Sequence, residues 1–419
     1  MQPPNTPAIA RSQSTADARI DFLTDLARHL HAYGTTAQRL EGALQAVAQP
    51  LGIECEPWSN PTGIILSFRS MEAGNEHNVT RVVRLLPGET DLYRLAEADR
   101  IADEVIAGRM DLLQGRNALR QLDQPAGART QAMRALGFGL AAAAVAGLLR
   151  LPWLDIGVAA ATGLVIGMLS WAAQRIVRLR ESFEALSGMV AGGIALLVAA
   201  YWTPLNLNTV VIASLIVLLP GLSLTNAVNE LTSQHLVSGT ARFAGALATV
   251  MKLAVGTMIA FIAADLCGLE AQVRASRPQP WWVEAGALLA GSYAFAVLFR
   301  ACIRDYPVVM AAAIIGYLLS RMGDAQWGHP VGIFLSALVT TALGNLYARV
   351  AGRPGALVRV PGIIMLVPGS IALRGLLSML QTQDAAAVQQ PLILLLGTLL
   401  ALIAGLMFGS LLVPTRRYL

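Results

Sequence analysis

Long apolar runs fill the chain after residue 129, whereas the part before it alternates between apolar and polar positions. A helix needs about 20 apolar residues to cross a hydrocarbon layer of about 30 Å, and ten runs meet or approach this length. The first and seventh runs are short, so nine or eight crossings remain alternatives. The ten runs are residues 133–150, 152–174, 186–203, 206–227, 241–265, 282–299, 306–321, 329–348, 357–380 and 391–414.

The region before these runs has the patterns of a small domain that folds in water. Apolar residues recur at helical spacing up to Pro50 and then alternate in GIECEPW, GIILSFRS and NVTRVVRLL, which predicts two helical pieces followed by three strands. Two amphipathic helices follow, over about 92–105 and 110–122. Residues 17–125 therefore predict an α+β domain. Residues 1–16 are polar, lack the apolar core of a signal peptide and predict a disordered cytosolic tail.

The arginines between the apolar runs indicate how the chain is oriented. They concentrate on alternate connectors, and positive charge marks the cytoplasmic side of a membrane protein. Trp281 and Trp282 fit an aromatic belt at the opposite surface. An even number of crossings then places both termini in the cytosol. The arginines of the cytoplasmic side are Arg129, Arg134, Arg175, Arg178, Arg180, Arg300, Arg304, Arg349, Arg353, Arg359, Arg416 and Arg417.

Composition supports this division and excludes several classes of protein. Of the 419 residues, 55% are hydrophobic and 14% are charged, which excludes a purely soluble protein. The net charge of +5 comes from arginines at the ends of apolar runs and not from one basic face, so no nucleic-acid partner is expected. The three cysteines and five histidines form no CxxC or HExxH motif, so we expect neither a metal nor a cofactor.

A short motif occurs twice, in the fourth run of each group of five. Pro220 and Pro368 both lie in an L-L/V-P-G sequence that is followed by a serine. Because five is odd, consecutive groups of five enter the membrane from opposite sides, as in the inverted repeats of many secondary transporters. The fold class predicted is thus a polytopic α-helical membrane protein of about ten transmembrane helices. It has two inverted five-helix repeats, residues 131–266 and 280–415, after a small N-terminal α+β cytosolic domain.

Both Pro-Gly pairs should interrupt their helices at membrane depth. Proline removes a backbone donor and glycine relaxes the chain, so Pro220-Gly221 and Pro368-Gly369 are expected to unwind the helix locally. A half-helix that restarts there presents unpaired N–H groups, which suit a carboxylate. The alternative is that each pair is only a packing kink.

Polar and charged side chains near the two interruptions are the candidate binding residues. Lys252, near the middle of its apolar run, is the strongest single candidate for function, because an ionisable group in a membrane segment needs a partner or water. The alternatives are a wetted membrane surface for Glu230, a structural ion pair for Lys252, snorkelling for Arg374 and an interfacial position for Asp155. Asp155, Glu230 and Lys252 are also candidates for proton coupling. The predicted binding residues are Pro220, Gly221, Ser223, Thr225, Asn226, Glu230, Lys252, Pro368, Gly369, Ser370 and Arg374.

Four segments resemble the threonine/serine exporter family of bacterial inner-membrane proteins. They are HAYGTTAQRLEGAL (31–44), LPGETDLYRLAEADRIADEVIAGRMDLLQG (86–115), LLPGLSLTNAVNELTSQHLVSGTARF (218–243) and VPGIIMLVPGSIALRG (360–375). The resemblance covers nearly the whole chain and implies a ten-span carrier that exports L-threonine and L-serine with the proton gradient. The implied partners are a small solute, protons and the lipid bilayer, with a homo-oligomer left open.

The chain departs from the family pattern at three positions. Glu230 stands where aspartate is expected, Met365 where proline is expected and Leu373 where tyrosine is expected. Because split-chain relatives resemble dicarboxylate exporters, a succinate-type substrate is an alternative. A passive channel is another.

A hydrolase is the alternative from a different class of protein. Its support is Asp21, Asp25 and His29, which share one helical face at four-residue spacing. The chain has no GxSxG nucleophile motif to accompany them, and a solvated helix face explains the same pattern.

Overall fold

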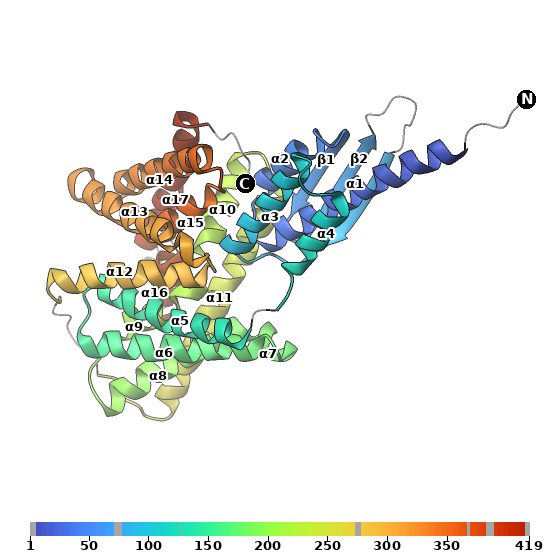
Figure 1. The fold of residues 1–419 in the computed structure, drawn as a ribbon. Coiled ribbons are helices and arrows are strands. Elements are labelled where there is room, and N and C mark those ends of the chain that lie inside the picture. The colour runs from blue at the N-terminus through green and yellow to red at the C-terminus, as the bar shows by residue number, and fades with distance from the viewer. Residues whose placement is uncertain are drawn as a thin grey trace, which may run out of the picture.

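The computed structural model describes residues 6–70, 78–125, 127–272, 278–366, 369–382 and 389–414. It has two parts: an N-terminal region of helices and one sheet (residues 6–125), and a larger part made of helices alone (Figure 1). The N-terminal region lies at one end of the helical part, against the ends of several long helices (Figure 1).

The N-terminal region is a three-stranded antiparallel sheet with four helices, and its strands are hydrogen-bonded in the order β1-β2-β3. Alternate residues of β2, namely Ile64, Leu66 and Phe68, are buried in one apolar core with Phe22 and Leu26 of α1. The elements are α1 (Thr6–Ala32), α2 (Ala37–Ala48), β1 (Ile53–Asn60), β2 (Gly63–Ser70), β3 (Asn78–Arg84), α3 (Leu92–Ile106) and α4 (Leu112–Gln121).

Helix α1 begins earlier than the sequence suggested. Its first residue is Thr6, so the disordered tail predicted for residues 1–16 is wrong from residue 6 onward. Residues 8–16 include three alanines and hold neither glycine nor proline, so they can extend a helix that the buried part of α1 has already nucleated. Residues 1–5 lie outside the described residues.

The helical part confirms a polytopic membrane protein. Within the described residues, nine helical segments are long and apolar enough to cross a bilayer, or ten if the bent pair α9 and η1–α10 is one span. The elements of the helical part, spans and connecting segments together, are α5 (Ala128–Leu148), α6 (Trp153–Ala173), α7 (Val177–Glu181), α8 (Phe183–Tyr201), α9 (Leu207–Ser214), η1 (Ile216–Leu218), α10 (Gly221–Thr232), α11 (Leu236–Leu266), α12 (Trp281–Leu298), η2 (Ile303–Asp305), α13 (Tyr306–Trp327), α14 (His329–Ala351), α15 (Ala356–Ile364), α16 (Gly369–Thr382) and α17 (Gln389–Leu412).

The fourth span is interrupted at the predicted place. Helix α9 ends at Ser214, a short 3-10 turn follows, and α10 begins at Gly221, with a bend of 56° between the two parts. In the ninth span, α15 ends at Ile364 and α16 begins at Gly369. Pro368 lies outside the described residues, so the predicted effect of that proline stays a prediction.

The two groups of five spans pack in the same order. The third and fifth spans lie along each other, as α8 on α11 and α14 on α17. The first part of the interrupted span packs on the second and third spans, as α9 on α6 and α8, and α15 on α13 and α14. Its second part packs on the fifth span, as α10 on α11 and α16 on α17.

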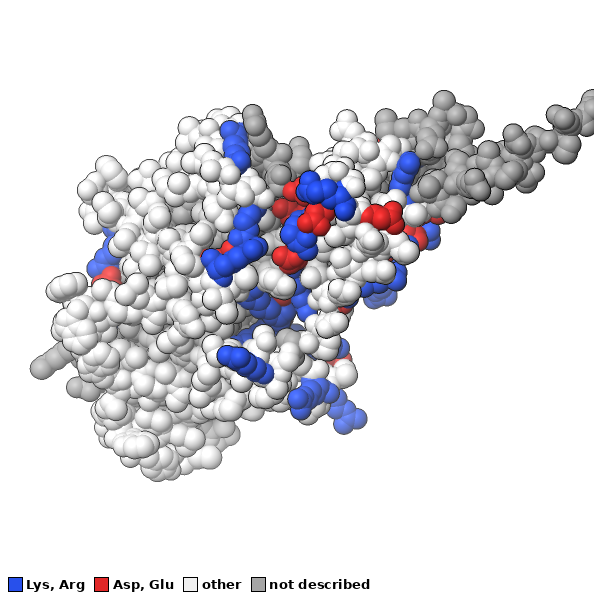
Figure 2. Space-filling model, in the orientation of Figure 1, with Lys and Arg blue, Asp and Glu red and all other residues white. Residues whose placement is uncertain are grey.

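Charged side chains gather at the end of the helical part that faces the N-terminal region (Figure 2). There Arg134 pairs with Glu89 at 3.1 Å and Arg300 pairs with Asp91 at 3.0 Å. At the far end, the rings of Trp153 and Trp282 lie 5.8 Å apart. The predicted arginine-rich connectors at Arg134 and Arg300 are thus on the same side as the N-terminal region.

Candidate functional site

A cavity of about 280 Å³ lies where the N-terminal region meets the helical part, and we call it the central cavity. Its walls come from the loop between α1 and α2, from the beginning of α2, and from α10, α14, α15 and α17. Its volume is at the small end of the range for ligand pockets, about 300–1,000 Å³. The polar and charged side chains that line it are Tyr33, Thr35, Thr36, Gln38, Arg39, Thr90, Thr225, Asn226, Asn229, Thr232, Ser233, Thr341, Arg359 and Ser410.

Several hydroxyl groups of the central cavity are buried without a partner. The oxygens of Tyr33, Thr35, Thr36 and Thr341 have no hydrogen bond within the described part of the chain. Burial raises the pKa of the Tyr33 phenol far above its ordinary value of 10, so this group stays a neutral donor. Because an unsatisfied buried polar group costs about 1–3 kcal/mol, a cluster of them around one cavity is typical of a site that binds a polar ligand.

Two arginines give the central cavity a positive charge. Arg359 of α15 is 9% exposed, and Arg39 of α2 is partly buried. Neither guanidinium has an ion pair or a hydrogen bond in the described residues, and none of the described residues that line the cavity is acidic. Burial lowers the pKa of the Arg39 guanidinium to about 10, which leaves it charged at neutral pH. Unpaired buried cations of this kind favour an anionic ligand.

Helix α10 supplies the remaining polar groups because the interruption before it turns its first residues toward the cavity. Asn226 and Asn229 line the cavity, and their side-chain amides have no partner in the described residues. The hydroxyl of Thr225 donates to the carbonyl oxygen of Gly221 at 3.0 Å, which leaves its lone pairs free to accept. The amides of Leu222 and Ser223 in the first turn have no acceptor in the described part of the chain.

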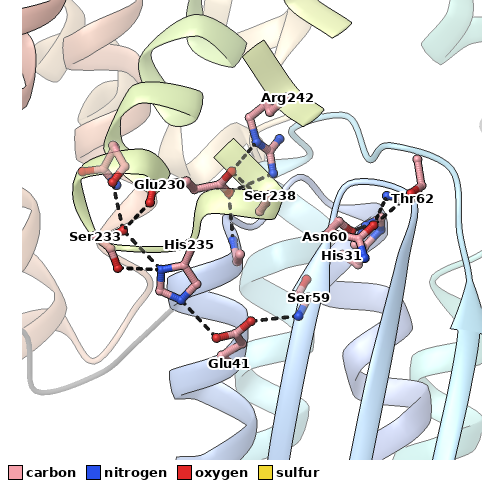
Figure 3. Close-up of polar contacts among 12 residues, drawn as sticks. His31, Glu41, Ser59, Asn60, Thr62, Glu230, Ser233, His235, Ser238 and Arg242 are labelled. Atoms are coloured by element: carbon pink, nitrogen blue, oxygen red, sulfur yellow. Dashed lines mark hydrogen bonds and ion pairs between the residues drawn. The ribbon is translucent and has the colours of Figure 1, made fainter. Parts of the chain in front are cut away.

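Glu230, one turn further along α10, does not line the cavity and instead fastens the N-terminal region to the helical part (Figure 3). Its carboxylate is fully buried, with a relative exposure of 0%. It accepts two hydrogen bonds from Arg242, each 3.1 Å long, and one of 2.8 Å from Ser238. A fourth, of 3.0 Å, comes from the backbone N–H of Ala37 at the start of α2. The wetted-surface alternative for Glu230 is therefore wrong.

A second link lies beside this one. His235 Nε2 is 3.0 Å from a carboxylate oxygen of Glu41, whose other oxygen accepts from the backbone N–H of Ser59 at 2.8 Å (Figure 3). The two links join α2 of the N-terminal region to Glu230 of α10 and to His235, which precedes α11. They hold the loop that contains Tyr33 over the cavity.

The structure brings together only part of the predicted set of binding residues. Thr225 and Asn226 line the central cavity, and Gly221 and Gly369 lie against each other beside it. Ser223 and Ser370 do not line it, and Arg374 is an exposed residue of α16.

Two further predicted residues, Lys252 and Asp155, lie elsewhere. Lys252 is on the exposed face of α11, with its amine 3.6 Å from a carboxylate oxygen of Glu184 in the first turn of α8, so the geometry favours the ion-pair alternative. Asp155 is 1% exposed and lies in the first turn of α6, so its side chain is buried among the helices, and the interfacial alternative stays a prediction. One of its oxygens accepts from the backbone and side chain of Asn206, at 3.2 and 2.9 Å, and the other has no partner in the described residues.

The acidic residues of the hydrolase alternative are used in ion pairs. Asp25 lies 3.0 Å from Arg116, and Asp21 lies 2.9 Å from the same guanidinium. His29 faces Asp123 at 3.2 Å. These contacts hold α1 against α4 and its following turn, which is a structural role.

The residues that sequence reasoning missed are those that the N-terminal region and α15 contribute. Arg359 was read as one of the connector arginines, and Arg39 lies in a segment with ordinary helical periodicity. The only local signal was Tyr33-Gly34 in HAYGTTAQR. Gly34 has a φ of +80°, and a Cβ there would lie 2.9 Å from the backbone nitrogen of Thr90, so only glycine fits.

Comparison with known proteins agrees with the arrangement of the two parts. A family model for threonine/serine exporters matches residues 21–263, which is more than half of the chain. A second family model, "Threonine/Serine exporter, ThrE", matches residues 287–412. The chain belongs to the threonine/serine exporter family. The first match begins inside α1 and ends in α11, and the second runs from within α12 to the end of α17, so both the N-terminal region and the helical part are features of this family.

Individual relatives of this family member are distant. A "Probable threonine/serine exporter" of Mycobacterium tuberculosis is 26% identical over 416 residues, which cover 95% of this chain and 77% of that protein. A "Pheromone-regulated membrane protein 10" of Candida albicans is 25% identical, and one of Saccharomyces cerevisiae is 24% identical. This chain spans 34% and 48% of the length of these two fungal proteins. No solved structure matches the chain.

Proposed function

We propose that this chain is a secondary carrier that exports L-threonine and L-serine from the cytosol of a bacterium. The observation that carries the proposal is the central cavity, where two unpaired arginines and a set of unpartnered hydroxyl and amide groups line a space of about 280 Å³. A hydroxy amino acid offers a matching set of groups: a carboxylate, a hydroxyl and an ammonium.

The chemistry of each wall assigns a place to each of these groups. The carboxylate binds the guanidinium of Arg359, a charge-assisted contact about twice as strong as a neutral one. The ammonium and the hydroxyl bind the side-chain oxygens of Asn226 and Asn229 and the lone pairs of Thr225, which lie on one face of α10. The apolar residues Leu222 and Ile363 complete the wall around the short side chain.

Alternating access follows from two inverted repeats, which the shared packing order of the two halves supports. The cavity is lined by α10 and α15, the halves of the interrupted spans that lie beside the N-terminal region. The other halves, α9 and α16, pack together through buried residues such as Val210 and Leu373. Asn208 and Gln381 join them by reciprocal amide hydrogen bonds of 3.0 and 3.1 Å. These contacts between α9 and α16 support a conformation in which the route to the far side is closed.

The membrane orientation that we propose places the N-terminal region in the cytosol. It rests on two arginines of the predicted cytoplasmic connectors, because Arg134 and Arg300 pair with Glu89 and Asp91 of the N-terminal region. The membrane is the bacterial inner membrane, with both termini in the cytosol. Export then begins in the central cavity.

Proton antiport is the coupling that we propose, and Asp155 is the group that the geometry favours for it. Glu230 is neutralised by Arg242, and Lys252 is paired with Glu184. Asp155 is buried with one free carboxylate oxygen and no cation beside it in the described residues, at the end of α6 far from the central cavity. A buried carboxylate without a counter-ion can take up and release a proton as the route on its side opens and closes.

Export of a succinate-type dicarboxylate is the second candidate function. One specific observation favours it: two arginines and no acidic residue line the cavity in the described residues. A dianion would neutralise both guanidinium groups, whereas a zwitterion leaves a net positive charge.

Proteoliposomes loaded with labelled threonine, serine or succinate test the proposal. We expect saturable efflux of threonine and serine that accelerates when an inward proton gradient is imposed. Asp155→Asn should lose this acceleration and keep exchange of internal for external solute. Efflux of succinate alone would favour the second candidate function, and equal rates with and without the gradient would exclude proton coupling. If none of the three solutes moves saturably, the proposed function is wrong.

A further inference from the structure

The N-terminal region forms one wall of the central cavity. The loop between α1 and α2 contributes Tyr33, Thr35 and Thr36, whose hydroxyl oxygens are all buried without partners in the described part of the chain. The first turn of α2 contributes Arg39. The N-terminal region, which the sequence predicts as a small α+β domain, therefore supplies one of the two unpaired cations of the site.

The N-terminal region is also fixed in this place and not merely adjacent. Glu230 of α10 accepts a hydrogen bond from the backbone N–H of Ala37, two residues before Arg39, and the carboxylate is fully buried. Gly34 packs so closely on the backbone of Thr90 that this contact restricts the position of the loop between α1 and α2. Both contacts restrict the position of Arg39 relative to α10.

Burying a guanidinium without a carboxylate is unfavourable, and two such groups in one small cavity repel each other. Burial already lowers the pKa of Arg39, as expected when its charge has no compensating partner. Arg100 of the same region, by contrast, binds both Glu97 and Glu104. An anionic ligand that binds between Arg39 and Arg359 would compensate the burial of both charges and would also reduce the repulsion between them.

We propose that Arg39, from the N-terminal region, is a substrate-binding and specificity-determining residue. Its guanidinium and that of Arg359 together bind a carboxylate of the transported solute. Arg39 does so from the side of the cavity that the N-terminal region forms. The inference rests on the proposed function, because it takes the central cavity as the transport site. It makes the N-terminal region part of the binding site, so that a solute without a carboxylate is a poor substrate.

Concentration-dependent efflux from proteoliposomes tests this role with three variants of the full chain. Arg39→Gln removes the charge, and Arg39→Lys keeps the charge but lacks the planar guanidinium that binds a carboxylate through two hydrogen bonds. The control is Arg109→Gln, which changes an exposed arginine of the same region that does not line the cavity. The KM for the transported solute should rise at least about tenfold in Arg39→Gln, since a charge-assisted hydrogen bond is lost. Arg39→Lys should recover part of this rise, and Arg109→Gln should behave as the wild type.

A second measurement does not depend on turnover. The wild type should unfold at a higher temperature when threonine, serine or succinate is added. Arg39→Gln should lose this shift, while its unfolding temperature without solute is at or above that of the wild type. A wild-type KM and a wild-type shift in Arg39→Gln would overturn the inference and leave the proposed function intact. If the wild type itself neither transports nor is stabilised by any of the three solutes, the proposed function fails, and the inference fails with it. A fall in turnover at unchanged KM, not recovered by lysine, would show a structural role and contradict substrate binding.

Discussion

Gly221 and Gly369, the first residues of α10 and α16, lie against each other where the two interrupted spans meet. A Cβ added to Gly369 would lie 3.3 Å from the backbone nitrogen of Gly221 and 3.0 Å from the Cβ of Leu219. The repeated Pro-Gly motif therefore does more than bend two helices, since its second residue permits their backbones to touch. This contact joins the two halves of the chain beside the central cavity.

A side chain at Gly369 should impair transport by separating the two interrupted spans. Gly369→Ala places a methyl group at the tight distances given above, and Gly369→Val adds two more carbons. Overpacking costs about 1–3 kcal/mol, which exceeds the gain of about 0.5–1 kcal/mol from replacing glycine in a helix. We expect a lower unfolding temperature in Gly369→Val and a fall in efflux of at least about tenfold, since the proposed alternation of access requires the two interrupted spans to meet at this contact.

Gly397 of α17 offers a matched control, because a Cβ there would meet nothing within 4 Å. Gly397→Ala should keep wild-type efflux and unfold at the same or a higher temperature. Normal transport by a well-expressed Gly369→Val would mean that the glycine contact is only incidental packing.

Removing either member of the Glu230–Arg242 pair should loosen the contact of the N-terminal region with the helical part, because Arg242 of α11 fixes the carboxylate that accepts from the backbone N–H of Ala37. The carboxylate is fully buried and the guanidinium is largely so, and breaking such a pair from one side costs about 3–5 kcal/mol because it leaves a buried charge. We expect Arg242→Gln and Glu230→Gln to lower the unfolding temperature and to raise the rate at which trypsin cleaves after Arg129, at the start of α5.

The double variant Glu230→Gln/Arg242→Gln distinguishes the cost of leaving one buried charge unpaired from the loss of the contact itself. Because it leaves no uncompensated charge, it should recover part of the stability that each single variant loses. Strictly additive losses in the double variant would show that the two side chains do not depend on each other. The exposed pair of Arg69 and Glu54 serves as a control, since a surface pair is worth about 0–1 kcal/mol.

The spans could be predicted from the sequence because a helix that crosses a bilayer must be apolar over a fixed length. That requirement is local, so each of the ten predicted runs overlaps a helix of the structure, including the break before Gly221. Lys252 shows the limit of the method. An apolar run gives the extent of a span and not the depth of each residue, and α11 starts at Leu236, so that Lys252 reaches the first turn of α8 and pairs with Glu184.

The binding site could be predicted only where one segment carries several of its residues. Thr225 and Asn226 follow the interruption directly and were found by their spacing. Arg39 and Arg359 are far apart in the sequence, and each looks ordinary within its own helix. Their importance depends on the packing of the N-terminal region on α15 and α10, which periodicity does not encode.

Mild acid should weaken the N-terminal region through His31. Burial lowers the pKa of its imidazole below the ordinary 6.5, and the nearby positive charge of Arg242 lowers it further. Hydrogen bonds with the backbone of Asn60 and Pro61 raise the pKa, but the net shift is downward. Since the unfolded chain binds a proton near pH 6.5 and the folded chain does so only at lower pH, the free energy of unfolding is highest above this value and falls as the pH drops below it.

The purified protein should thus unfold at a lower temperature at about pH 5.5 than at about pH 7.5. His31→Gln keeps a side-chain donor for the carbonyl of Asn60, which His31 Nε2 contacts at 3.1 Å, and cannot be protonated in this range. Its unfolding temperature should change less between the two pH values. The same change in both proteins would assign the acid sensitivity to other groups.

The three cysteines should report the orientation of the chain because they differ in exposure and in side. Cys267 is exposed at the end of α11 far from the N-terminal region, and Cys302 is partly exposed near Arg300 on the same side as that region. Cys55 is buried in β1, and burial, with a smaller effect of Glu56, raises the pKa of its thiol to about 12. The thiol therefore stays almost entirely protonated at neutral pH.

A membrane-impermeant maleimide should label Cys267 in intact cells, label Cys302 only after permeabilisation, and leave Cys55 unmodified until the protein is unfolded. Cys267→Ser should remove the labelling of intact cells. Labelling of Cys302 in intact cells, with Cys267 protected, would reverse the orientation and place the central cavity at the outer surface, where it could not receive a solute for export.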